Sequence, residues 1–367
     1  MKGIWKYKEF WPEVDPVDLV TLGEGNTPLV PSVHLGKEFD IPNLYFKLET
    51  GNPTGSYKDR FAASALTHLV KNRARLCLAT SSGNTGAALA AYSARSGLPC
   101  FLVIVDGAPS GKVNQMKGYG AKTLMVQGFG IDEVVSEDVF RSLKQFGLGM
   151  KSEVQISAYS YSPQGMMGVE SIAFEIAEAL PENCVKVFSP AGGGGLTLAI
   201  GKGFLEWGER DKSYRLPELY CVQPEGNNTI AGALINGQEK ANPIKESKTK
   251  ISGLQVPNVI DGNQTIEVCR RLNGGGEIVM DQQVFELQKA LAFKEGIYCE
   301  PAGAVSLAGA IKARKAGVVN KSDSVVCVIT GHGFKDPQSL QRMIKKEEDY
   351  FESIDGATKY IIKNLAN

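Results

Sequence analysis

A lysine stands just after a turn, at the start of a predicted helix. The stretch GNPTGSYKDR, residues 51–60, holds the turn residues Gly51, Pro53 and Gly55, and the apolar-rich run at 61–70 predicts a helix. Lys58 therefore lies at the helix end where the macrodipole disfavours a cation. Two interpretations follow: a solvated surface charge, or an amine that loses its proton readily and attacks a carbonyl carbon. The decapeptide alone leaves both open.

Four consecutive glycines lie between a predicted strand and a predicted helix. They occur in SPAGGGGLTLAIGKGF, residues 189–204, as Gly192, Gly193, Gly194 and Gly195. Bare backbone amides at a helix start favour an anion, and phosphate is the natural guest. A flexible turn is the alternative, but ordering each glycine costs ~0.5–1 kcal/mol, which favours a functional loop. The spacing fits neither GxxxxGK[ST] nor GxGxxG.

A second polar loop is predicted at residues 80–92, TSSGNTGAALAAY. Ser81, Ser82, Gly83, Asn84 and Thr85 follow an apolar run and precede a helical pattern. Hydroxyls and amides at a helix start suit a carboxylate. Asn84 and Thr85 could equally be helix caps, and the two roles are compatible because they use the same geometry.

A hydroxyl residue ends the predicted strand at 325–329. Thr330 precedes a Gly-His-Gly turn, and in open parallel sheets ligands bind at the carboxyl ends of the strands. His332 is either a base or a polar turn residue. With His34 and His68 as the other histidines, no metal site is predicted. An amine, a phosphate loop, a carboxylate loop and a hydroxyl together suit pyridoxal phosphate with an amino-acid substrate.

Short apolar runs alternate with helical patterns along the chain. Predicted strands lie at residues 76–80, 101–105, 185–189, 219–223 and 325–329, and predicted helices at 85–95, 165–180 and 302–316. Near-continuous apolar runs are typical of parallel strands buried on both faces. The pattern predicts an α/β fold with parallel sheets.

Composition excludes several classes of protein. The 367 residues carry 40 Lys plus Arg and 40 Asp plus Glu, which argues against nucleic acid or an anionic membrane as a partner. No apolar stretch approaches the ~20 residues of a membrane span, and the first residues lack the apolar core of a secretory signal. The seven cysteines are scattered without CxxC. We therefore expect a cytoplasmic protein with reduced thiols.

The order of these motifs resembles a known family. NPTGSYKDR, SSGNTG, PAGGGGL, GIYCEPAGA and TGHGFKD, preceded by LGEGNTPLVP at 22–31, resemble the threonine synthase branch of the fold type II (tryptophan synthase β) pyridoxal-phosphate enzymes. The likeness covers residues 20–340 approximately. It implies two open, mostly parallel sheets with the active site in the cleft between two domains: a smaller mobile domain at 45–170, and a larger one at 1–44 plus 171–367. It also implies a homodimer.

The resemblance assigns a role to each motif. Lys58 corresponds to the Schiff-base lysine, Gly192–Gly195 to the phosphate loop, and Asn84 to the partner of the cofactor's 3′ oxygen. The substrate carboxylate is held in this family by residues that match Ser81, Ser82, Gly83 and Thr85. Thr330 matches the partner of the pyridine nitrogen. A neutral hydroxyl there does not hold that nitrogen protonated, which favours elimination and replacement over transamination.

The substrate segment departs from the family pattern. Threonine synthases carry an Asn-Ser … Arg patch for the substrate phosphate. The stretch SAYSYSPQGMMGVES, residues 157–171, keeps Ser160 but has Tyr159 and Gly165 at the other two positions. A dianionic leaving group needs a cation, and Lys112 in SGKVNQ is the candidate.

We expect a lyase of the threonine synthase type that acts at Cβ or Cγ of an amino acid and converts phosphohomoserine to threonine. One alternative is a serine/threonine ammonia-lyase, because SGLQVP (252–257) and the four-glycine loop also resemble the sequences of those enzymes. A second alternative is a β-replacement synthase that uses O-phosphoserine. An inactive homologue that only binds the cofactor or an amino acid is the remaining alternative. Intact Lys58, Asn84 and Thr330 argue against it.

Overall fold

The larger sheet contains most of the predicted strands. The computed structural model describes residues 3–81, 83–106, 110–180, 185–344 and 350–365. In this part of the chain six strands form one sheet in the order β1-β2-β10-β7-β8-β9. Their bounds are β1 Leu29–Pro31, β2 Leu44–Leu48, β10 Ser324–Ile329, β7 Val185–Pro190, β8 Glu218–Pro224 and β9 Gly275–Val279. The β1–β2 pair is antiparallel and the other pairs are parallel.

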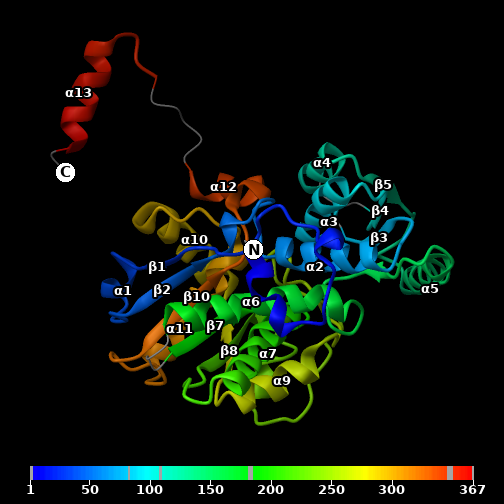
Figure 1. Cartoon of the computed structure of the whole chain (residues 1–367). Coiled ribbons are helices and arrows are strands. Elements are labelled where there is room, and N and C mark those ends of the chain that lie inside the picture. Colours follow the sequence, from blue (N-terminus) through cyan, green and yellow to red (C-terminus); the bar gives the residue numbers. More distant parts are fainter. Residues whose placement is uncertain (1–2, 82, 107–109, 181–184, 345–349, 366–367) are drawn as a thin grey trace.

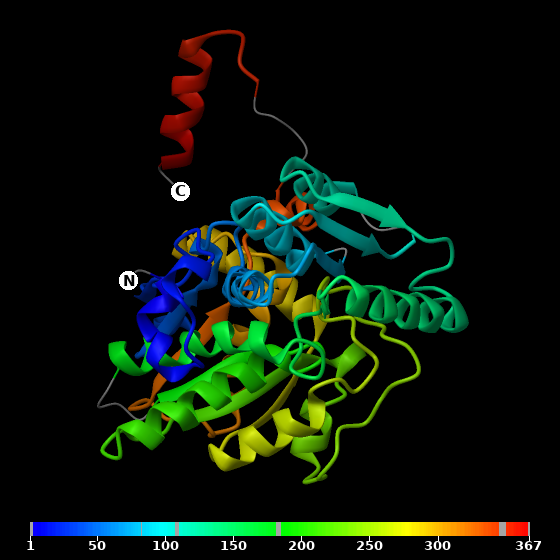
Figure 2. The same ribbon diagram turned by 45° about the vertical axis from the view of Figure 1, so that its right-hand side comes forward.

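The smaller sheet is wholly parallel. Among the described residues it has four strands in the order β5-β4-β3-β6, namely β5 Lys122–Met125, β4 Cys100–Ile104, β3 Cys77–Thr80 and β6 Val154–Gln155. The two sheets lie in separate regions of the molecule, with helices around each (Figures 1 and 2). The expected α/β fold with two open, mostly parallel sheets is confirmed.

Helices connect and cover the strands. The described helices are α1 Leu35–Glu38, α2 Lys58–Lys71, α3 Asn84–Ser96, α4 Ser110–Gly118, α5 Glu133–Gly149, α6 Pro163–Ala179, α7 Gly195–Arg210, α8 Ala231–Ile235, α9 Gly262–Arg271, α10 Asp281–Glu295, α11 Pro301–Lys315, α12 Pro337–Met343 and α13 Ile354–Leu365. The helices predicted at 85–95, 165–180 and 302–316 correspond to α3, α6 and α11.

Alternating residues along the strands of the larger sheet pack into two different hydrophobic cores, one on each face. Val187 and Val326 pack with α6 and α7, whereas Phe188 and Cys327 face the core that contains α11. Both faces of the larger sheet are thus buried, as the near-continuous apolar runs predicted. The first core also contains Ala79 of β3 together with residues of α2 and α3, so it continues from the larger sheet to the smaller one.

The predicted division into domains places its first boundary within a strand. The smaller sheet lies wholly inside residues 45–170, but β2 pairs with β10 in the larger sheet. The helix α2 belongs to the core shared by both sheets. The mobility of the 45–170 unit stays a prediction.

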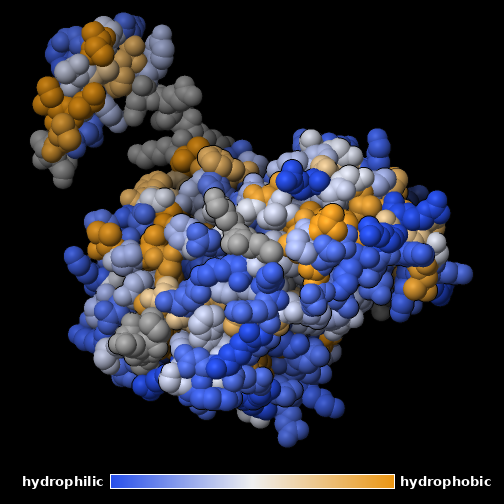
Figure 3. Space-filling model, in the orientation of Figure 1, coloured by the Kyte–Doolittle hydropathy of each residue, from blue (hydrophilic) through white to orange (hydrophobic). Residues whose placement is uncertain are grey.

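The last described helix stands away from the body of the molecule. Figures 1 and 2 show α13 extending outward, and Figure 3 shows apolar residues on its surface. Ile354, Ile362 and Leu365 are 82%, 62% and 81% exposed. Across the described ranges, we find no helix with the length and apolar character that crossing a membrane requires.

Candidate active site

Two of the predicted motifs are joined edge to edge. The loop before α2 and the loop after β10 form an antiparallel bridge between Ser56 and Gly331, and the His332 amide donates to Gly55 O at 2.8 Å. The Tyr57 amide donates to the Thr330 carbonyl at 3.1 Å. Thr330 is buried at the carboxyl end of β10, as predicted. The start of α2 is therefore held directly at the carboxyl edge of the larger sheet.

Lys58 is the first residue of α2 and is only partly buried. Its Nζ donates to Ser157 Oγ at 2.5 Å and lies 4.5 Å from the centre of the Tyr57 ring. Ser157 Oγ is also 2.9 Å from Thr85 Oγ1. The amine therefore points towards the start of α3 and the segment after β6, rather than into open solvent. This location favours the reactive-amine interpretation of Lys58 over the surface-charge one.

The four glycines form a tight loop between β7 and α7. Gly194 has φ +98°, a left-handed conformation that favours glycine, and directly precedes the first residue of α7. The carbonyls of Gly192 and Gly193 accept hydrogen bonds from Gln223 Nε2 and the Asp261 amide, each at 3.0 Å. A side chain at Gly192 would approach Val256 Cγ2 to 3.0 Å. The loop is thus fixed by its carbonyls, at the end of α7 that attracts anions.

Asn84 is the first residue of α3 and bonds a buried carboxylate. Its Nδ2 donates to Glu300 Oε2 at 2.7 Å, while its Oδ1 is buried without a hydrogen-bond partner in the described structure. Glu300 precedes α11, and its amide donates to Gly331 O at 2.9 Å. A Cβ at Gly331 would collide with Glu300 Oε2. Asn84 is thus oriented by one protein contact and retains an acceptor for another group.

A buried ionic network anchors the first turn of α2. Arg60 is completely buried; its Nε donates to Glu49 Oε2 and its Nη1 to Glu175 Oε1, both at 2.7 Å. Lys47 Nζ donates to Glu175 Oε2 at 2.5 Å. Burial opposes ionisation of Glu175, but Arg60 and Lys47 outweigh it and lower its pKa to about 2. The network therefore ties α2 to β2 and α6 two residues after Lys58.

A buried carboxyl also lies next to Lys58 in the sequence. Asp59 accepts hydrogen bonds from the Thr54 amide at 3.0 Å and from Thr54 Oγ1 at 2.8 Å. Burial raises the pKa of Asp59 to about 6, although these two bonds oppose the rise. Asp59 thus fixes the turn that leads into α2.

The structure describes all residues of the predicted carboxylate loop except Ser82. Ser81 Oγ accepts from the Gly83 amide at 3.3 Å and the Gly86 amide at 3.1 Å, so this hydroxyl holds the start of α3. Thr85 faces Ser157, as described above. Ser82 lies outside the described residues. The binding of a substrate carboxylate here stays a prediction.

The segment after β6 is tied to the loop before α9. Ser160 Oγ donates to Asp261 Oδ1 at 2.8 Å, and the Tyr159 amide donates to Asp261 Oδ2 at 2.8 Å. Tyr159 OH donates to Glu170 Oε1 at 2.6 Å. Ser160 thus has a structural partner, and its predicted contact with substrate stays a prediction.

Packing around Gly165 explains why no long side chain stands there. A Cβ at Gly165 would lie 2.5 Å from Phe61 Cε2 and 3.1 Å from Ala65 Cβ, because α6 approaches α2 closely at this point. An arginine at this position would require α2 and α6 to separate. Gly165 is therefore a position at which no cation for a phosphate can stand.

Two lysines lie on elements near the turn before α2. The backbone of Lys112 lies in α4, but its side chain is outside the described part of the structure. Gln115, three residues later, donates from Nε2 to Thr54 O at 3.4 Å. Lys335, which the sequence analysis did not select, donates from Nζ to Thr54 O at 2.7 Å and to Gln115 Oε1 at 2.9 Å. Helix α4 is therefore held close to the turn that leads to Lys58.

Ser157 and Glu300 are the main residues that the sequence analysis missed. Ser157 lies in a segment considered only for the substrate phosphate, and its neighbours Lys58 and Thr85 are distant in sequence. Glu300 stands in the quoted motif GIYCEPAGA, and its position before the proline that starts a predicted helix was the available signal. Among the described residues, no three His, Cys, Asp or Glu side chains are grouped to hold a metal ion.

Comparisons with known proteins agree with this arrangement. Residues 20–331 match the model of the family described as pyridoxal-phosphate dependent enzyme. The chain is 34% identical to a threonine synthase of Methanocaldococcus jannaschii over 99% of this chain and 88% of that protein. It is 36% identical to a threonine synthase of Halalkalibacterium halodurans over 92% of this chain and 91% of that protein. Processed threonine deaminase isoform 2 of Solanum lycopersicum has the same fold, with TM-score 0.74, 19% identity, and coverage of 93% of this chain and 92% of that one.

Proposed function

Because this chain belongs to the pyridoxal-phosphate-dependent enzyme family and is a lyase of the threonine synthase type, we propose that it converts O-phosphohomoserine into threonine. The observation that carries the proposal is that Lys58, Asn84, Thr330 and the four-glycine loop each lie at a strand end or a helix start, in a chain that matches threonine synthases over nearly its whole length. The roles of the individual residues form part of the proposal.

The residues present suit pyridoxal phosphate. The loop Gly192–Gly195 would hold the phosphate, since α7 begins at its end and a side chain at Gly194 would collide with Thr265 Oγ1. The partly buried Asn84 side chain has a second amide hydrogen beyond the one given to Glu300, and would donate it to the cofactor's 3′ oxygen. Thr330 would present its hydroxyl to the pyridine nitrogen.

Lys58 is proposed as both the anchor of the cofactor and the base. When bound, pyridoxal phosphate supplies an aldehyde that condenses with amines and a ring that stabilises negative charge at the substrate Cα. Lys58 Nζ would hold the aldehyde carbon until the substrate amine replaces it, and would then take the proton from Cα. Ser157 and Thr85 would orient the released Lys58 amine towards the reacting atoms. Ser157 Oγ accepts the hydrogen bond from Lys58 Nζ and is itself within hydrogen-bond distance of Thr85 Oγ1.

The net change is loss of phosphate from Cγ and addition of water at Cβ. The Cα proton taken by Lys58 is returned to the carbon skeleton, so that the overall reaction consumes one water and releases one phosphate. A cation must stabilise the departing phosphate. We propose Lys112 for this role, because α4 is held at the turn before Lys58 through Gln115.

A serine/threonine ammonia-lyase is the second candidate function. The observation that favours it is Gly165, whose packing against Phe61 leaves no room for an arginine. Losing one charge-assisted contact costs about 1.5–3 kcal/mol, or about 10- to 100-fold in specificity. We therefore expect kcat/KM for phosphohomoserine to be lower than in threonine synthases that have the arginine.

A substrate panel separates the two functions. Phosphohomoserine, serine, threonine and O-phosphoserine are each incubated with the holoenzyme, and threonine, phosphate and 2-oxo acids are measured. The proposal predicts threonine and phosphate from phosphohomoserine. Ammonia and a 2-oxo acid from serine or threonine, without threonine from phosphohomoserine, would establish the ammonia-lyase instead.

The role of Lys112 has its own test with a matched control. Lys112→Ala should lower kcat/KM for phosphohomoserine about 10- to 100-fold. Lys117→Ala, in the exposed last turn of the same helix, should leave it unchanged. Native values of kcat/KM in both variants would exclude Lys112 and direct attention to Lys335, whose ammonium group lies at this turn.

Three further proposals concern the whole molecule. Residues 45–170 form a smaller mobile unit that closes over the substrate, the protein is a homodimer, and it works in the cytoplasm. The exposed apolar residues of α13 support association, and the six described cysteines, all free and buried, suit a reducing compartment. Sedimentation analysis of the holoenzyme tests the dimer.

A further inference from the structure

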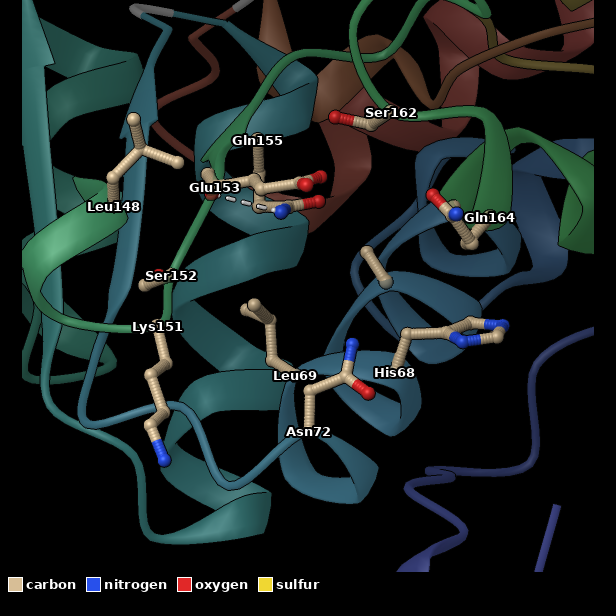
Figure 4. A pocket seen from close by; sticks show the side chains of 12 residues that line it. His68, Leu69, Asn72, Leu148, Lys151, Ser152, Glu153, Gln155, Ser162 and Gln164 are labelled. Atoms are coloured by element: carbon tan, nitrogen blue, oxygen red, sulfur yellow. Dashed lines mark hydrogen bonds between the residues drawn. The ribbon is translucent and has the colours of Figure 1, made fainter. Parts of the chain in front are cut away.

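A polar cavity lies beside the second half of α2, whereas Lys58 is at the start of that helix. It has a volume of about 210 Å³ and is bounded by the second half of α2, by β6 with the residues before it, and by the start of α6 (Figure 4). The first α2 residue in its wall is Ala65, seven residues after Lys58, which is about 10 Å along a helix. The cavity is therefore separate from the cluster around Lys58, yet shares its helix.

The charged group that faces this cavity is a carboxylate. In Figure 4 the ends of the Glu153 and Gln155 side chains point towards Gln164 and His68, whereas the Lys151 ammonium points away from them. Gln155 Nε2 donates to the Glu153 carbonyl at 2.9 Å, so the amide oxygen of Gln155 is its remaining polar end. A carboxylate and an amide oxygen in one wall favour a ligand that donates hydrogen bonds and carries positive charge.

The remaining walls define the rest of such a ligand. Burial, together with Lys71, lowers the pKa of His68, so this imidazole is neutral at physiological pH and does not offset the Glu153 charge. Ala65 and Leu69 add an apolar surface, and the side-chain amides of Asn72 and Gln164 can donate hydrogen bonds. The cavity is smaller than the ~300–1,000 Å³ that is usual for drug-sized ligands. Its dimensions and chemistry suit one small aliphatic amino acid.

The wall of the cavity is continuous with the partner of Lys58. Ser162 Oγ lines the cavity and accepts from the Ile156 amide at 3.1 Å, and Gln155 directly precedes Ile156. The next residue is Ser157, which accepts the hydrogen bond from Lys58 Nζ. In addition, Gln155 pairs with Ala79 on β3, one residue before the end of that strand. A displacement of Gln155 or Ser162 would therefore move the hydroxyl that orients Lys58.

We propose that this cavity is an effector site for a small aliphatic amino acid, whose ammonium group is bound by Glu153 and Gln155. Binding of this amino acid displaces Ser157 and so changes the orientation of the Lys58 side chain. The ligand's carboxylate meets the amides of Asn72 and Gln164, and its side chain meets Leu69. The site is separate from Lys58, Asn84 and the glycine loop, which take no part in its wall, but it includes Gly165, one position of the predicted substrate-phosphate patch.

The test uses valine as the probe and the holoenzyme as the protein. Calorimetric titration is carried out on the native protein, on Glu153→Gln, on Gln164→Trp, which fills the entrance without changing charge, and on the matched control Lys151→Gln. Glu153, Gln164 and Lys151 are exposed, so the variants should fold, and thermal melts verify this. Isovalerate, which lacks the amine, is titrated in parallel, and the visible absorbance of the bound cofactor is recorded.

The expected result is saturable valine binding in native protein and Lys151→Gln, and affinity at least about tenfold lower in Glu153→Gln and Gln164→Trp, as for the loss of one charge-assisted contact. Isovalerate should not bind, and valine should shift the visible band in native protein but not in Glu153→Gln. Equal valine affinity in all four proteins would place valine in the substrate site and overturn the proposal. Binding that depends on Glu153 but leaves the visible band unchanged would overturn the coupling through Ser157.

Discussion

Removing the Glu300 carboxylate should weaken cofactor binding even though Glu300 is not assigned to the cofactor. Glu300 is 4% exposed, and its Oε2 accepts the hydrogen bond from Asn84 Nδ2 at 2.7 Å. In Glu300→Ala the Asn84 amide loses the partner that orients it, while the backbone bond from residue 300 to Gly331 O is retained. The proposed bond between Asn84 and the cofactor's 3′ oxygen then has to pay for ordering the amide.

The magnitude follows from the type of contact. A hydrogen bond to a charged group contributes about 1.5–3 kcal/mol, and each ~1.4 kcal/mol is a tenfold change in affinity. If the whole of this free energy is lost from cofactor binding, the Kd for pyridoxal phosphate rises about 10- to 100-fold in Glu300→Ala. Glu300→Gln keeps an acceptor oxygen without the charge, so its loss should be smaller.

The assay is titration of the apoprotein with pyridoxal phosphate, followed by visible absorbance. Asn84→Ala and the double variant Asn84→Ala/Glu300→Ala complete a double-mutant cycle, and the double variant should bind about as weakly as the weaker single variant. Glu286→Ala, on the exposed side of α10, is the control and should bind normally. Additive losses in the cycle, or a change below about twofold in Glu300→Ala, would refute the claim that Glu300 acts through Asn84.

Three other changes test the loop, the ionic network and a titrating carboxyl. Gly194→Asp should abolish stable cofactor binding, because it places a carboxylate at the phosphate loop, its Cβ collides with Thr265 Oγ1 and its φ of +98° is strained for aspartate; native-level cofactor occupancy by absorbance would place the phosphate elsewhere. Glu175→Gln should lower the free energy of unfolding by about 3–5 kcal/mol, because it leaves Arg60 and Lys47 buried with one carboxylate fewer; denaturant unfolding measures this, and a loss below about 1 kcal/mol would contradict it. Burial raises the pKa of Glu170 from 4.5 to about 7, so the folded state binds the extra proton and native stability falls as pH rises through this window, by about 3 kcal/mol in total. In Glu170→Gln this part of the pH dependence should disappear in melts between pH 4.5 and 8, and an unchanged slope would show that another group is responsible.

Local patterns were enough to find the main parts of the site. The turn before Lys58, the four glycines and the hydroxyl residue at the end of β10 are each defined by neighbouring residues, so they are visible in the sequence as stretches of chain. The five apolar runs likewise became β3, β4, β7, β8 and β10, because a strand buried on both faces needs a near-continuous apolar segment. The motif order then identified the family.

Long-range contacts were decided only by the tertiary structure. Ser157 is 99 residues from Lys58, and Glu300 is 216 residues from Asn84. No periodicity or spacing encodes such pairs, because they depend on how the two sheets and α2 pack together. The same packing gives Ser160 a partner in Asp261 and closes the space at Gly165 against Phe61. The sequence by itself determined which residues could do chemistry, whereas the fold decided which partners orient them and which substrate contacts remain open.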